Sequence, residues 1–244
     1  MHTNSDIANR LDVKQVPVLP TGVSHLFKTL TDDSISFNDL AGILEQFPSI
    51  AARLIALANS SWSSPISPIT SLEMACSRLG FDVVRSTSIA FSVASPFDSN
   101  RCPSFNAKYF WTTALLAADA TSWLSEGSKS IQTELPTMRT AGLIHNLGLL
   151  LLVDQLAEEV HQTIKMVEES EDLSLGDELR YTLGFNHLDA GLLLGQAWGF
   201  PEPLVEAMAG KVVDESNEQS TGEIAGIVGL SVSMIQCLQF NHRP

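Results

Sequence analysis

The stretch Pro136 to Val153, PTMRTAGLIHNLGLLLLV, is mostly apolar and predicts a buried helix. Two polar residues, His145 and Asn146, stand at its centre among leucine, isoleucine, alanine and glycine. A buried imidazole beside a buried carboxamide must find hydrogen-bond partners or lower the stability of the fold. The neutral amide of Asn146 is also a much weaker ligand for magnesium or manganese than a carboxylate. The main functional question is therefore whether the centre of this predicted helix holds a chemical site.

The composition of the chain suits helix-on-helix packing. Of its 244 residues, 44% are hydrophobic and only 17% are charged, which is enough for one large domain or a domain with appendages. A net charge of -14 repels phosphate backbones, and the 14 lysines and arginines form no basic cluster. We therefore expect no nucleic-acid partner.

Cysteine usage and the apolar segments indicate a cytoplasmic protein. The three cysteines, Cys76, Cys102 and Cys237, are far apart and predict neither a disulfide framework nor a zinc site. The first fifteen residues lack the apolar core of a signal peptide. Residues 224–240 are the one candidate membrane segment, and polar residues such as Ser231 within it favour a core helix instead. We expect no membrane segment.

The predicted elements are all helical. Apolar residues recur at helical spacing along the chain, and no segment alternates with period two for long enough to predict a strand. Capping residues mark helix starts: Ser36 and Ser174 are predicted N-caps, Thr70 with Glu73 forms a predicted capping box, and Asn186 is the predicted N-cap of a helix that runs to Trp198. The sequence thus predicts an all-α fold of about twelve helices.

Prolines and polar runs divide the chain into predicted parts. Residues 96–104 contain two prolines in a polar run, which predicts a boundary between two helical lobes. The first helix of the N-terminal lobe is predicted over residues 21–30. We expect an N-terminal arm over 1–16, one domain over 17–213 with lobes at about 17–95 and 105–213, and a linker with a C-terminal helix over 214–244.

Two of the six histidines are candidates for a binding site. His145 lies in the buried stretch, and His187 comes just after a predicted N-cap, with Asp189 two residues further on. Such a pair can be structural, with hydrogen bonds to backbone or water, or it can hold a metal ion or a phosphate group. Neither a Gly-x-Ser-x-Gly motif nor a glycine-rich phosphate loop accompanies them. The residues by themselves leave both interpretations open.

Several motifs in a fixed order then suggest a family. They are FNDLAGILEQFPSI at 37–50, LANS at 57–60, ACSRLG at 75–80, AGLIHNLG at 141–148, HLDAG at 187–191 and AWGFPE at 197–202. Together they resemble the HDOD domain, a bacterial signalling relative of the HD metal-dependent phosphohydrolases, over about residues 19–211. The resemblance implies an all-α, HD-like bundle of helices in two packed lobes.

The resemblance also indicates where metal ligands would lie. Catalytic HD enzymes use a histidine, a His-Asp pair and a distant aspartate; these positions fall here on Thr112, on His145 with Asn146, and on Val232. A His-His step common in the family falls on Gly210 and Lys211. By this placement His145 alone survives of the four core ligands. The predicted remnant pocket comprises Thr112, His145, Asn146, His187, Lys211 and Val232.

We therefore expect a non-enzymatic, bacterial regulatory module that contacts a protein partner in a signalling pathway, with no catalytic residue and no cofactor. If a divalent metal binds at all, we expect it to be weakly held by His145 and His187. Two alternatives remain: a metal-dependent phosphohydrolase with a degenerate ligand set, and a sensor that binds a small phosphorylated ligand through Lys211, His145 and His187. For the polar groups themselves, a hydrogen-bonded knot between helices is the main structural interpretation.

Overall fold

The fold is all-α, as predicted. The computed structural model describes residues 11, 16–18, 35–126, 135–170, 173–210 and 222–240, and no strand occurs within these ranges. The chain forms two compact units: Leu19–Pro96 is one, and Met1–Val18 together with Phe97–Pro244 is the other. The predicted helix at 21–30, Lys211 and nearly all of the predicted arm lie outside the described residues.

The smaller unit contains four described helices: α3 (Phe37–Leu44), α4 (Pro48–Ala58), α5 (Leu72–Leu79) and α6 (Phe81–Ala94). Ser36 and Asp39 form reciprocal hydrogen bonds at the start of α3, as expected for a capping box. The predicted cap of α5 at Thr70 is wrong by one residue, because the side chain of Ser71 accepts the bond from the Met74 amide. Ile50, Leu54 and Leu57 form the buried face of α4.

The larger unit contains the other helices, which are α7 (Ala107–Glu126), α8 (Leu135–Ile144), α9 (Leu147–Gln155), α10 (Ala157–Glu168), α11 (Leu175–Leu183), α12 (His187–Ala197), α13 (Glu202–Ala209) and α14 (Glu223–Phe240). A short 3-10 turn, η2 (Ser99–Arg101), precedes α7. Ser174 and Asn186 cap α11 and α12 as predicted.

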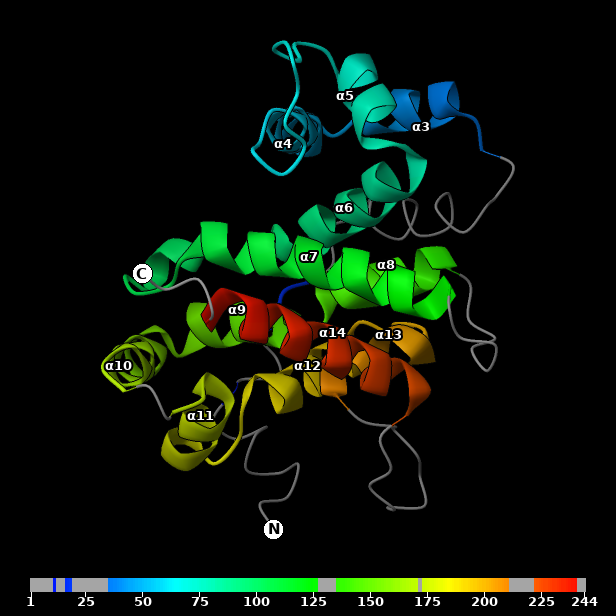
Figure 1. Cartoon of the computed structure of the whole chain (residues 1–244). Coiled ribbons are helices and arrows are strands. Elements are labelled where there is room, and N and C mark those ends of the chain that lie inside the picture. Colours follow the sequence, from blue (N-terminus) through cyan, green and yellow to red (C-terminus); the bar gives the residue numbers. More distant parts are fainter. Residues whose placement is uncertain are drawn as a thin grey trace. The chain divides into compact units, whose positions relative to one another are not determined.

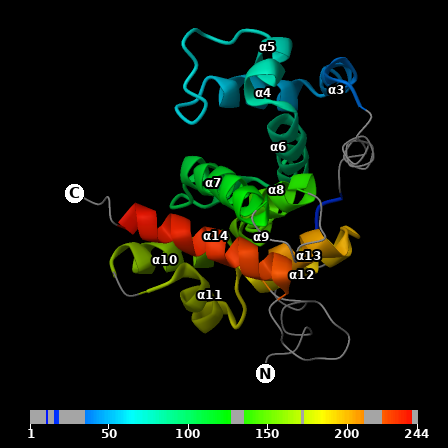
Figure 2. The same ribbon diagram turned by 45° about the vertical axis from the view of Figure 1, so that its right-hand side comes forward.

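The helices α7, α8 and α14 pack together in the larger unit (Figures 1 and 2). A Cβ added at Gly142 of α8 would lie 2.9 Å from the Ala117 carbonyl oxygen of α7, so only glycine permits this approach. The buried Arg139 of α8 pairs with Asp119 of α7 at 2.6 Å. The final helix is joined to α7 by a buried hydrogen bond of 3.1 Å between Thr121 and Ser231.

The decisive stretch does not form one continuous helix, so that prediction was wrong. The helix α8 ends at Ile144, and α9 begins at Leu147. Asn146, between them, has φ −105° and ψ 16°, which lies outside the helical region. The interruption falls on the two polar residues, and it places Asn146 at the start of a new helix.

The helices α9 and α12 approach each other at backbone distance. A Cβ added at Gly148 would overlap the His187 carbonyl oxygen and the Gly191 amide nitrogen, and it would lie 2.8 Å from the Gly191 Cα. A Cβ added at Gly191 would lie 2.5 Å from the Met208 carbonyl oxygen of α13. These two glycines therefore bring α9, α12 and α13 together, and they set the residues before α9 beside the start of α12.

Within the described part of the chain, no single helix is both long and apolar enough to cross a membrane. One bent pair, residues 135–155 with 157–168 at an angle of 117°, meets the length and composition criteria together. Most of residues 138–153 are buried inside the protein, as the core of a folded unit requires.

Candidate functional site

His145 is held in one tautomer by its own turn of the chain. Its Nδ1 lies 2.7 Å from the carbonyl oxygen of Gly142, which can only accept, so Nδ1 carries the proton and donates it. Burial lowers the pKa of His145, and the bond to Gly142 opposes this only in part. The ring is therefore neutral at pH 7, and its Nε2 presents a lone pair.

Asn146 is the N-cap residue of α9, but its side chain does not cap the helix. Its Oδ1 is fully buried and has no hydrogen-bond partner in the part of the chain that the structure describes. An unsatisfied buried amide oxygen costs about 1–3 kcal/mol, so a residue of this kind in a folded protein requires an explanation.

His187 is the first residue of α12, beside the N-terminal end of α9. The capping box of Asn186 and Asp189 fixes the backbone around it. The ring edge faces α11, where a Cβ added at Gly176 would lie 3.2 Å from the His187 Cε1. Its Nδ1 is buried without a hydrogen-bond partner among the described residues. Burial, and then the nearby His145, lowers the pKa of His187 to about 4, although Asp189 acts in the opposite direction.

Among the described residues, no hydrogen bond of a predicted knot joins these side chains to another helix. His145 bonds within its own turn, and Asn146 Oδ1 and His187 Nδ1 have no partner. The three side chains therefore add polar atoms to the interior without the hydrogen bonds that would make them a structural link. We call this group of three residues, His145, Asn146 and His187, the HNH cluster.

No hydrogen bond or ion pair between described residues links the other predicted pocket residues to the HNH cluster. Thr112 is exposed on α7, and its hydroxyl donates to the Lys108 carbonyl of the same helix at 2.8 Å. Val232 lies on α14, half-buried, next to the Ser231 that bonds to α7. Lys211 lies outside the described residues, so its place in the pocket stays a prediction.

The donor set of the cluster does not fit a hard catalytic cation. Magnesium and manganese prefer carboxylate oxygens, and no group of three histidine, cysteine, aspartate or glutamate side chains converges anywhere in the described ranges. The nearest carboxylate in sequence, Asp189, accepts from the Asn186 amide at 3.0 Å and pairs with Arg180 at 2.9 Å. No hydrolytic step can therefore be derived from these residues.

Sequence reasoning missed the residues that position the cluster. Gly148 and Gly191 allow α9 and α12 to touch, and Gly176 leaves room for the His187 ring. Glycines inside otherwise apolar helical runs were the available signal, because such a glycine lowers helix stability and is often present for close packing. The partner of each glycine could not be inferred, since it comes from a distant part of the chain.

Comparison with known proteins identifies the fold. The structure is similar to an HDOD domain protein of unknown function from Geobacter sulfurreducens, with a TM-score of 0.68 and 22% identity over 93% of this chain and 78% of that one. A candidate phosphohydrolase from Shewanella amazonensis SB2B is similar with a TM-score of 0.68 and 21% identity, over 96% of this chain and 81% of that one. A candidate signal transduction protein from Marinobacter aquaeolei VT8 is similar with a TM-score of 0.71 and 20% identity. The match covers 94% of this chain and 55% of that one, so this chain spans about half the length of the Marinobacter protein.

No functionally curated protein is significantly similar to this chain. At these levels of identity the structural neighbours establish the fold alone. The family model of the HDOD domain, however, matches residues 16–212, which is most of the sequence. It covers both the LANS and ACSRLG motifs of the smaller unit and the HNH cluster of the larger one. The chain therefore belongs to the HDOD domain family.

Proposed function

We propose that this chain is a non-enzymatic regulatory module of bacterial signal transduction, which acts in the cytoplasm through contacts with a protein partner. The observation that carries the proposal is the engagement of Asp189 Oδ2 in a helix cap and an ion pair, because Asp189 is the nearest carboxylate in sequence to His187. Family membership and the naming of one structural neighbour for signal transduction agree with this role.

Exposed apolar side chains on α7 and α14 support a role in protein contacts. On α7, Tyr109 and Trp123 are exposed by 55% and 67%, and both are large aromatic residues of the type enriched at interfaces. On α14, Leu230 and Met234 are exposed by 53% and 41%, although this helix also packs against α7 and α13. A partner that covers these residues would gain apolar burial.

The proposal predicts that hydrolysis cannot be restored by one substitution. We expect no turnover of nitrophenyl phosphate, bis-nitrophenyl phosphate or cyclic nucleotides by the wild type or by Asn146→Asp, with magnesium or manganese present, because the remaining ligand positions are not carboxylates or imidazoles. Purification without chelator, followed by elemental analysis, should show less than one tightly bound divalent metal per chain. Turnover that depends on His145 would contradict the proposal.

A second function, sensing of a small ligand, is favoured by the unpartnered atoms of the HNH cluster. Asn146 Oδ1 and His145 Nε2 both present lone pairs, and both rings are neutral at pH 7. Such a site suits a ligand that offers N–H or O–H donors rather than a fully ionised phosphoryl group, whose oxygens only accept. Of the two interpretations of the polar groups, the structure therefore supports the ligand pocket better than the knot.

The effect of Asn146→Leu on stability separates a structural role from a binding role. Because Asn146 Oδ1 makes no hydrogen bond in the protein, we expect the free energy of unfolding to stay equal or to rise by about 1 kcal/mol. Urea unfolding of the two proteins measures this difference. A loss of 2 kcal/mol or more, on the order expected for removal of a satisfied buried group, would mean that Asn146 has a structural partner after all.

A further inference from the structure

The HNH cluster lies at the N-terminal ends of α9 and α12. The C-terminal ends of the same two helices contact the places where the chain passes from one compact unit to the other, which we call the connections. Asn146 and His187 stand at the N-terminal ends of α9 and α12. Asp154 is in the last turn of α9, and Trp198 is the C-cap residue of α12. The chain passes between its units after Val18 and after Pro96. Both connections are fastened to the larger unit by Asp154 and Trp198.

Trp198 holds both connections at once. Its indole Nε1 donates to the Pro17 carbonyl oxygen at 2.8 Å, one residue before the first connection. Its ring packs against Phe97, the residue that follows the second connection, with the ring centroids 5.9 Å apart. Phe200 lies on the same indole, with a centroid distance of 5.5 Å. Any displacement of the C-terminal end of α12 therefore moves contacts to both connections.

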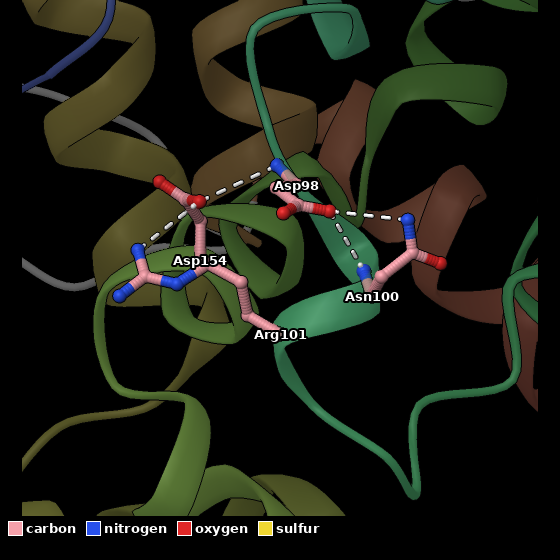
Figure 3. A network of polar contacts seen from close by, with 4 residues as sticks. All are labelled: Asp98, Asn100, Arg101 and Asp154. Atoms are coloured by element: carbon pink, nitrogen blue, oxygen red, sulfur yellow. Dashed lines mark hydrogen bonds and ion pairs between the residues drawn. The ribbon is translucent and has the colours of Figure 1, made fainter.

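Asp154 also contacts the chain just after the second connection, at Asp98 and Arg101 (Figure 3). Its Oδ1 accepts from the Asp98 amide at 3.3 Å and pairs with Arg101 at 3.5 Å, while Asp98 in turn accepts from Asn100. A carboxylate in the last turn of a helix is unfavourable, because the helix dipole is negative there. The contacts to Asp98 and Arg101 offset this cost and explain why an aspartate stands at this position.

The two helices can move only together near their N-terminal ends. At Gly148 the backbones of α9 and α12 touch, and no flexible side chain separates them. Gly148 lies two residues after Asn146, and the oxygen that it faces is the carbonyl of His187 itself. Packed backbones transmit a displacement as a rigid body, because they cannot deform continuously.

We propose that α9 and α12 form a rigid relay between the two ends of these helices. It couples binding of a ligand at the HNH cluster to the contacts that Trp198 and Asp154 make with residues 17 and 97–101, which we call the fastening. The inference rests on the proposed signalling role, because a relay of this kind serves a protein that reports an event at one place to another. By linkage the coupling is reciprocal: weakening the fastening must alter the cluster, and altering the cluster must loosen the fastening.

The coupling can be measured in the full-length chain without knowledge of a ligand. Asp154→Ala and Trp198→Phe each remove a fastening bond, and Trp198→Phe keeps an aromatic ring. We expect both variants to shift the ring Cε1–H NMR signals of His145 and His187. The matched control is Glu206→Ala: like Asp154, Glu206 is a carboxylate that accepts from the backbone, here from the amides of Ile224 and Ala225, but it fastens α14 instead. It should leave both signals in place.

The reverse direction uses Asn146→Leu, which alters the cluster. We expect roughly fivefold faster hydrogen exchange at the Asp98 amide, as a weakened hydrogen bond implies. Unmoved histidine signals in both fastening variants, or equal shifts in Glu206→Ala, would overturn the relay, as would unchanged exchange at Asp98. These readouts do not depend on hydrolysis or metal content, so the relay and the non-enzymatic role can fail separately.

Discussion

Replacement of Gly148 by alanine should destabilise the protein by about 3 kcal/mol, at the upper end of the usual cost of overpacking. The added Cβ would overlap the His187 carbonyl oxygen and the Gly191 amide, which are backbone atoms that no rotamer change can move aside. The two helices would have to separate, and part of the burial between α9 and α12 would be lost. Urea unfolding of the variant and the wild type measures the difference.

Gly229→Ala is the matched control for this substitution. Gly229 is exposed in α14, and a Cβ added there would meet nothing within 4 Å. Because alanine favours the helix over glycine, we expect this variant to gain up to about 1 kcal/mol. If Gly148→Ala were tolerated as well as Gly229→Ala, the close approach of α9 and α12 would be disproved, and the relay would lose its rigid contact.

The second large effect is a loss of stability in mild acid. The pKa of His187 is lowered to about 4 in the folded chain, against 6.5 for an ordinary histidine. The unfolded chain therefore binds a proton between these two pH values that the folded chain does not, so the free energy of unfolding is unaffected above pH 6.5 and falls as the pH drops from 6.5 to 4. The full difference corresponds to about 3 kcal/mol, and less where water reaches the ring.

The variant His187→Gln tests the origin of this acid effect. Glutamine cannot titrate, so the pH dependence between 6.5 and 4 should become shallower than in the wild type. A part should remain, because burial also lowers the pKa of His145. Urea unfolding at pH 7.5, 6, 5 and 4.5 gives the two curves. Parallel curves for wild type and variant would show that His187 titrates normally in the folded protein.

The helix starts show how far local sequence carries a prediction. Ser36, Ser174 and Asn186 were identified as caps because each precedes an apolar helical run, and the structure confirms them. At Thr70 the same rule was wrong by one residue, since the neighbouring Ser71 is an equally good cap. Capping depends on a few bonds within one turn, and for that reason it can be predicted from neighbours in the sequence.

The interruption at His145 and Asn146 shows where local reasoning fails. Composition predicted a single helix from 136 to 153, because no proline and no strong breaker stands in its centre. The break allows Asn146 to begin α9 at the place where Gly148 meets α12. That contact joins residues about forty positions apart, and nothing in the local pattern encodes it.

The all-α class and the HDOD family could both be determined from the sequence, because they depend on periodicity and on motifs in order. The weakness of the metal ligand set, which depends on residue identity at positions 112, 145, 146 and 232, stays a prediction. Only the tertiary structure decided that Asn146 Oδ1 and His187 Nδ1 lack partners, and that Asp189 serves a cap and an ion pair. Satisfaction of a buried polar atom depends on which distant groups fold against it, and this is a property of packing rather than of sequence spacing.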